Sequence, residues 1–122
     1  MTAKPSVALS ASGRVATVVV TGDLDLHTVP ALREALLTGT KAGPDVLHVD
    51  LVGVDFCDST GMSVLATAAK RMGVLGGRLV VSGAQPLPYR VFALTGLTAL
   101  VEVHPADAGD LSASWELEHT PD

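Results

Sequence analysis

The stretch Asp45–Gly73 reads DVLHVDLVGVDFCDSTGMSVLATAAKRMG, and its hydrophobic period changes once, midway along. Its first part, Asp45–Val52, alternates between apolar and other residues, which predicts a β-strand. After Asp58 the apolar residues recur every three or four positions, which predicts an α-helix that ends at Gly73. The strand's apolar face holds Leu47, Val49 and Leu51, and the helix is expected to bury Met62, Leu65, Ala66, Ala69 and Met72.

Strand signals also precede this stretch. Val15–Thr21 is rich in β-branched residues and is closed by a glycine, so it predicts a strand. The weaker run Ser6–Ser10 leads into a turn at Ala11–Gly13, and the two runs together predict a hairpin. A helix follows from Thr28, which is expected to cap it, and ends at Gly39 or Gly43. The inward face of that helix is expected to hold Val29, Leu32 and Leu36.

The same alternation continues towards the C-terminus. Arg78–Ser82 predicts a strand, Pro88–Thr95 a short helix ended by Gly96, and Leu100–Val103 a last strand. The short helix is expected to turn Val91 and Leu94 inward. Helices that follow strands favour parallel pairing through crossover connections. The sequence therefore predicts an α/β fold: a mixed sheet of about four to five strands, with helices packed against it and the hairpin at one edge.

The length of 122 residues predicts one domain. We expect this domain to span residues 1–105 and to be followed by an acidic segment, 106–122. No Lys or Arg occurs from Val91 onward, whereas six acids do. Leu111 and Trp115 lie four positions apart in the acidic segment, which allows at most a short, marginal helix there.

The composition excludes several functions. A net charge of −5 argues against nucleic acid or an anionic membrane as the main partner. The chain has one cysteine, no export signal and no apolar run long enough to span a membrane, so we expect a cytoplasmic protein. No long apolar edge or heptad suggests self-association, and a monomer is expected.

Enzymatic and metal-binding roles have little support. Cys57–Gly61 partly resembles the nucleophile turn of serine hydrolases, but position 57 is not glycine and those enzymes need a larger sheet. His104 is the only histidine in a plausible place, and a serine without an adjacent base is a poor nucleophile. The four histidines lack ligand spacing and are expected to be surface or half-buried side chains, so neither a metal nor a cofactor is predicted. Aspartates near strand ends suit a phospho-receiver, yet the late strands offer no lysine to complete one. Cys57 is expected to be a small, half-buried packing residue.

Ser59 is the residue with the strongest functional case. It falls at the N-cap or in the first turn of a helix, directly after Asp58. A cap is sufficient to explain a serine there, but the same position leaves the hydroxyl accessible for modification. A phosphate at a helix N-terminus is favourable by about 0.3–1 kcal/mol, so modification is expected to leave the fold intact and to act on a partner.

Three segments resemble the sulfate transporter and anti-sigma factor antagonist (STAS) domain family. They are the Gly22–Asp25 turn, the segment Val49–Gly61 that contains Asp58-Ser59-Thr60-Gly61, and Val91–Leu97. Together they lie within Ser6–Pro105. The resemblance is closest to stand-alone bacterial anti-sigma factor antagonists. It implies that Ser59 is phosphorylated, and that Asp25, Asp58, Thr60 and Gly61 contact the partner.

In that family the partner is an anti-sigma factor serine kinase of the histidine-kinase-like ATPase type, and a serine phosphatase reverses the modification. The resemblance therefore implies a regulator without enzymatic activity of its own, which binds the kinase and releases a sigma factor until Ser59 is phosphorylated. Cys57, Met62 and Ser63 depart from the family pattern, and Thr60 is an alternative acceptor. A second interpretation is a STAS subunit of a lipid-transport ABC system that is not phosphorylated.

Overall fold

The computed structural model of the protein describes residues 6–106, and it confirms the predicted α/β fold. The described chain contains five strands and four helices. In order, they are β1 (Ser6–Ser12), β2 (Val15–Thr21), α1 (Val29–Lys41), β3 (Val46–Gly53), α2 (Ser59–Val74), β4 (Arg78–Ala84), α3 (Pro86–Thr95), α4 (Leu97–Leu100) and β5 (Glu102–Pro105). The acidic segment falls, apart from Ala106, outside the described residues.

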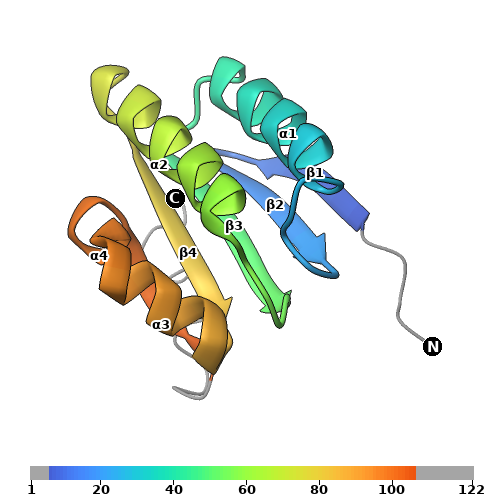
Figure 1. Cartoon of the computed structure of the whole chain (residues 1–122). Helices are drawn as coiled ribbons and strands as arrows, with labels where there is room; N and C mark the ends of the chain where they lie inside the picture. Colours follow the sequence, from blue (N-terminus) through green and yellow to red (C-terminus); the bar gives the residue numbers. More distant parts are fainter. Residues whose placement is uncertain (1–5, 107–122) are drawn as a thin grey trace.

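The five strands form one mixed sheet in the order β1-β2-β3-β4-β5. The pair β1–β2 is an antiparallel hairpin that turns at Gly13 and Arg14, and the other neighbouring pairs are parallel. Each crossover steps to the next strand in the same direction, so right-handed connections place the helices on one face of the sheet. Figure 1 shows α1 and α2 side by side across that face, with α3 and α4 next to them.

The main core lies between this face and the helices. Leu47, Val49 and Leu51 of β3 have no exposed surface, which confirms the face predicted from their alternation. Side chains from β2 and β4 extend the same layer, and α1 contributes the expected residues. The residues of α1 in this core are Val29, Leu32 and Leu36. The fold therefore rests on a layer of aliphatic side chains beneath the helices.

The buried face of α2 differs in part from the prediction. Leu65 and Met72 are buried as expected, but Met62, Ala66 and Ala69 are only half-buried. The structure instead buries Val64 and Ala68, because α2 lies between α1 and α4 and is covered on both flanks. The helix also continues past Gly73 to Val74.

The predicted inward face of α3 is wrong. Leu94 is 79% exposed and Val91 is half-buried, whereas Phe92 is completely buried. The helix begins at Pro86, two residues before the expected start, and meets the core through Pro88 and Phe92. These two are four positions apart and therefore share one side of the helix.

Several boundaries also differ. The first strand extends to Ser12, and β4 continues beyond Ser82 to Ala84. The last strand begins only at Glu102, since the preceding residues form the short helix α4, which the sequence did not predict. Gly43 lies beyond the end of α1 at a φ of 72°, whereas Gly39 is buried inside that helix.

Candidate functional site

Two loops meet at the carboxyl end of the parallel strands. The loop after β2 and the loop after β3 are joined by a β-bridge between Leu24 and Cys57. The Leu24 N–H donates to the Phe56 carbonyl at 2.8 Å, and the Asp58 N–H donates to the Leu24 carbonyl at 3.0 Å. The Gly22–Asp25 turn and the Asp58–Gly61 motif, which lie far apart in sequence, are therefore held together.

Asp58 caps helix α2. Its Oδ1 accepts hydrogen bonds from the backbone N–H of Thr60 at 2.9 Å and of Gly61 at 3.1 Å. The same oxygen accepts a hydrogen bond from the Thr60 hydroxyl. The N-cap is therefore Asp58, and Ser59 is the first residue of the helix.

The two hydroxyls of the motif have different environments. Ser59 is exposed, and its Oγ has no hydrogen-bond partner within residues 6–106. Thr60 is half-buried, and its hydroxyl is held by Asp58. The Ser59 hydroxyl is thus available to a phosphate donor without breaking an internal bond, and the Thr60 hydroxyl is not.

Gly61 allows α2 to start directly against the bridge between the two loops. It is buried, and a Cβ at this position would lie 3.0 Å from Cys57 Sγ and 3.1 Å from Leu24 Cβ. These distances are shorter than ordinary van der Waals contact, so a larger side chain would push the helix start away from the bridge. Gly61 therefore sets the position of Ser59 through packing.

Cys57 is a packing residue, and it is more deeply buried than the sequence suggested. Its side chain is 1% exposed. Burial, together with the neighbouring Asp58 charge, raises the pKa of its thiol to about 12. Because the thiolate is the reactive form, this thiol is unreactive at neutral pH.

Asp25 organises the loop before α1. Its Oδ1 accepts hydrogen bonds from the backbone N–H of His27 at 2.9 Å and of Thr28 at 3.3 Å. The expectation that the Thr28 side chain caps α1 is wrong. Its hydroxyl donates to the Asp23 carbonyl at 2.6 Å and contacts Asp25 Oδ1, so it closes the loop rather than the helix end.

Replacing Asp58 with Ala is expected to cost about 1 kcal/mol of folding free energy at pH 7, because the helix loses its cap. Hydrogen bonds from the Thr60 hydroxyl, and then from the Gly61 and Thr60 N–H groups, hold the pKa of Asp58 below its ordinary value. A lowered folded-state pKa stabilises the fold above the ordinary aspartate pKa, and this contribution is lost as the pH falls through the lowered value. Urea unfolding at pH 7 and near pH 3 measures both effects.

Asp58→Asn is the matched control, since asparagine caps a helix without titrating. Its stability is expected to fall less than that of Asp58→Ala at pH 7. The difference in the free energy of unfolding between Asp58→Asn and the wild type should shrink in acid. If the difference in the free energy of unfolding is the same at both pH values, the cap hydrogen bonds do not lower the pKa of Asp58.

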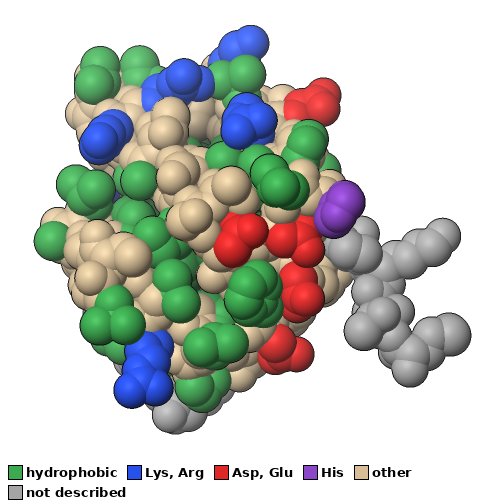
Figure 2. Space-filling view, in the orientation of Figure 1, with side chains coloured by type: hydrophobic (Ala, Val, Ile, Leu, Met, Phe, Trp, Pro, Cys, Tyr) green, Lys and Arg blue, Asp and Glu red, His purple; other side chains and the backbone are tan. Residues whose placement is uncertain are grey.

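The surface around the two loops is acidic and partly apolar. Figure 2 shows acidic side chains gathered over the ends of β2 and β3 and the start of α2, whereas Lys and Arg lie over the helices. Leu26 is 71% exposed and Phe56 is 42% exposed, both within these loops. Sequence reasoning missed them, although large apolar residues in loops that belong to no periodic face are a usable signal.

A cavity of about 480 Å³ lies between α1 and α2 and was also not predicted. Ser59 and Thr60 line it together with Ser63, and both helices contribute apolar side chains. Arg33 of α1 and Arg71 of α2 add positive charge. No pattern within either helix predicts this cavity, because it depends on how the two pack together.

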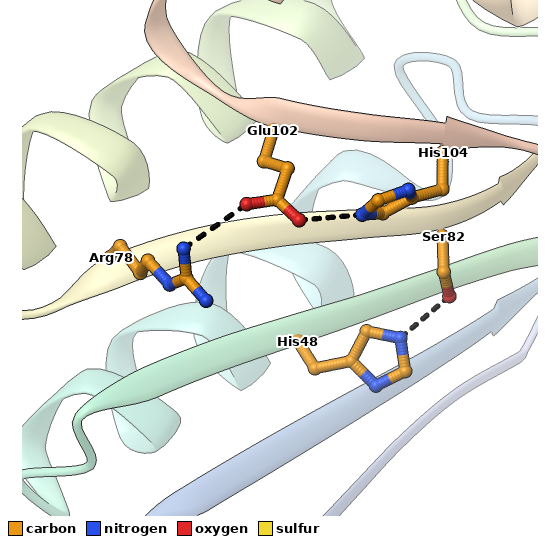
Figure 3. A network of polar contacts seen from close by, with 5 residues as sticks. All are labelled: His48, Arg78, Ser82, Glu102 and His104. Atoms are coloured by element: carbon orange, nitrogen blue, oxygen red, sulfur yellow. Dashed lines mark hydrogen bonds and ion pairs between the residues drawn. The ribbon is translucent and has the colours of Figure 1, made fainter. Parts of the chain in front are cut away.

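The described residues contain neither a metal-binding cluster nor a helix suited to span a membrane. Residues 6–106 contain no group of three or more His, Cys, Asp or Glu arranged to hold a metal ion. No helix in that range has the length and apolar character that crossing a membrane requires. His48, expected to be exposed or half-buried, is instead buried in β3, where its Nε2 lies 2.6 Å from Ser82 Oγ of β4 (Figure 3).

Comparison with known proteins identifies the family. Residues 7–102 match the family model described as "Mlab, STAS domain". An anti-sigma-B factor antagonist of Listeria monocytogenes is 34% identical over 86 residues, which is 70% of this chain and 75% of that protein. An anti-sigma factor antagonist of Mycobacterium paratuberculosis superposes with a TM-score of 0.78 at 29% identity, covering 93% of this chain and 97% of that one.

The phosphorylated form of SpoIIAA, a Bacillus cell fate determinant, shares the fold. Its TM-score is 0.65 at 20% identity, over 80% of this chain and 90% of that one. The family match covers β1 to β4 almost completely, the four helices and both loops of the site, and it ends at the start of β5. The named relatives are anti-sigma factor antagonists. The chain belongs to the STAS domain family.

Proposed function

We propose that this protein is an anti-sigma factor antagonist that binds an anti-sigma serine kinase and dissociates when Ser59 is phosphorylated. The observation that carries the proposal is the contrast between the exposed, unbonded Ser59 hydroxyl and the Thr60 hydroxyl held by Asp58. The names of the relatives support the same role. The existence of a phosphorylated form of SpoIIAA supports the type of modification.

Phosphorylation at Ser59 is compatible with the fold. A kinase transfers the γ-phosphoryl group of ATP to Ser59 Oγ, the hydroxyl proton is lost, and ADP leaves. The phosphate then lies at the N-terminus of α2, where the helix dipole favours negative charge. Because Ser59 is exposed and its Oγ makes no hydrogen bond within residues 6–106, the new group breaks no hydrogen bond in this part of the chain. A phosphatase would restore the hydroxyl by hydrolysis.

The inhibitory effect is expected at the interface with the partner. The two loops present Asp25 and Asp58 beside exposed Leu26 and Phe56. Such a surface suits a partner with complementary positive and apolar groups. Phosphate adds about two negative charges beside Asp58, and desolvation and like-charge repulsion then oppose binding. Thr60 and Gly61 contribute mainly by fixing the geometry of this surface.

The test is displacement of a sigma factor from a kinase-type anti-sigma factor. With ADP, the wild-type chain is expected to form a stable complex with the kinase and to release the sigma factor. With ATP, the wild type should lose this ability over time, whereas Ser59→Ala should keep it. Thr60→Ala is the matched control and should still be inactivated.

Two results would overturn the proposal. One is that no kinase-type anti-sigma factor binds, while an ATPase subunit of a lipid-transport system forms a stable complex. This outcome would establish the alternative role of a transporter subunit. The other is that the wild type and Ser59→Ala displace the sigma factor equally after long incubation with ATP.

A further inference from the structure

The cavity between α1 and α2 is an elongated groove. Its lining residues recur every three or four positions, from Arg33 to Thr40 on α1 and from Ser59 to Arg71 on α2. The two helices follow parallel strands and run side by side in the same direction (Figure 1). At a rise of about 1.5 Å per residue, the groove extends for about 18 Å along α2. Arg33 therefore lies nearer the Ser59 end, and Arg71 lies at the opposite end.

The floor of this groove is apolar. Leu36 and Leu37 of α1 and Val64 and Ala68 of α2 form it, and three of these side chains also belong to the main core. The volume of 480 Å³ falls within the range of small-molecule sites, about 300–1,000 Å³. Spread over about 18 Å, it corresponds to a cross-section of about 27 Å². A partner helix, about 10 Å across, is too wide to enter such a groove.

The walls of the groove offer few free hydrogen-bonding groups. The hydroxyls of Ser63 and Thr67 donate to the carbonyls of Ser59 and Ser63, each at 2.9 Å. The Thr40 hydroxyl donates to the Leu36 carbonyl at 2.7 Å. An extended peptide in the groove would leave N–H and C=O groups of its backbone unpaired, which is unfavourable. An alkyl chain has no such groups and suits these walls.

The charge of the groove is positive. Arg33 and Arg71 line it, and no acidic residue of the described chain does so. Neither arginine forms an ion pair within residues 6–106. The acidic side chains gather instead over the loops at the start of α2, at the Ser59 end (Figure 2). An anionic group is therefore attracted most strongly to the Arg71 end, which lies furthest from these acids.

We propose that the groove binds a single-chain amphiphile with an anionic head group, of the fatty-acid type. Two N–H groups of the Arg71 guanidinium donate to the carboxylate, a geometry that arginine and carboxylate share. The alkyl chain lies on the apolar floor and points towards Ser59. Arg33 lines the wall with its aliphatic stem and adds a weaker attraction, because its charge lies further from the head group.

Calorimetric titration of the unphosphorylated full-length protein with decanoate, below its micelle concentration, tests the proposal. Decanoate is expected to bind saturably, and decan-1-ol, which has the same chain but no charge, several-fold more weakly. Arg71→Gln should weaken decanoate binding about three- to five-fold, the effect expected of an exposed ion pair. Lys70→Gln is the matched control. It removes an exposed cation beside Arg71 that does not line the groove, so affinity should change little.

A second pair of variants tests the location. Thr67 is exposed and lines the middle of the groove, so Thr67→Trp should fill it and abolish binding. Thr38 is exposed on α1 but does not line the groove, and Thr38→Trp should bind normally. Circular dichroism shows whether both variants fold. In the wild type, amide chemical-shift changes on decanoate addition should centre on Leu37 and Val64, and they decide if Thr67→Trp unfolds.

Several results would overturn the proposal. They are an absence of decanoate binding, an equal affinity for decan-1-ol, and equal losses in Arg71→Gln and Lys70→Gln. Binding retained in a folded Thr67→Trp variant, or shift changes centred outside the groove, would also overturn it. So would binding of an acidic amphipathic peptide in place of decanoate. No kinase is present in these measurements, so their outcome does not depend on whether Ser59 is phosphorylated.

Discussion

Ser59→Asp is expected to weaken binding to the anti-sigma kinase by about 30- to 100-fold, equivalent to about 2–3 kcal/mol. The substituted carboxylate places a permanent negative charge at the first residue of α2, next to Asp58. In the complex that charge must lose water beside a like charge, and both effects oppose association. Ser59→Ala adds no charge and should bind at least as tightly as the wild type. Calorimetry or surface plasmon resonance with the purified kinase measures both variants.

Ser63→Asp is the matched control for this prediction. Ser63 is exposed one turn further along α2, and its hydroxyl donates to the Ser59 carbonyl at 2.9 Å. A charge at this position leaves the start of the helix unchanged, so a smaller loss of affinity is expected. If Ser59→Asp binds as tightly as the wild type, or if both aspartates weaken binding equally, repulsion centred on Ser59 is not the mechanism.

Gly83→Ala is expected to cost about 3 kcal/mol of folding free energy, because it combines a strained backbone conformation with a close contact. Gly83 has a φ of 70°, where a side chain costs about 1–2 kcal/mol. The new Cβ would also lie 2.9 Å from Val52 Cβ and 3.0 Å from Val52 N, and relief of such crowding costs about 1–3 kcal/mol. Urea unfolding followed by circular dichroism measures the loss.

Gly43→Ala separates the two contributions. Its φ of 72° is nearly the same, but a Cβ there meets nothing within 4 Å. Only the conformational cost, about 1–2 kcal/mol, is therefore expected. Equal losses for the two variants would show that the close approach of β3 to β4 at Gly83 relaxes without cost.

The strands and the two long helices could be predicted because each has one clear period. In β3 the alternation of Leu47, Val49 and Leu51 has a single interpretation, and the structure buries all three. Helix α3 has no such pattern, because its large apolar residues lie on several of its sides. They are Leu87, Val91, Phe92 and Leu94. Periodicity could not choose among these sides, and contact with the core selected Phe92.

The motif around Ser59 could be located from the sequence, but its geometry could not. The serine and the threonine are both hydroxyl residues at a helix start, and the sequence does not distinguish a free hydroxyl from a bonded one. The difference arises because the Asp58 carboxylate turns towards Thr60. Similarly, Asp25 was expected to contact a partner, and its hydrogen bonds show that it also shapes its own loop. The cavity that includes Arg33 depends on the packing of two helices.

The most direct test of the central claim is the site of phosphate transfer. The purified chain is incubated with a kinase-type anti-sigma factor that binds it and with ATP, and its intact mass and peptides are then analysed. One phosphate on Ser59 is expected in the wild type and in Thr60→Ala, and none in Ser59→Ala. A phosphate on Thr60, or no phosphate at all from a kinase that binds the chain, would contradict the account.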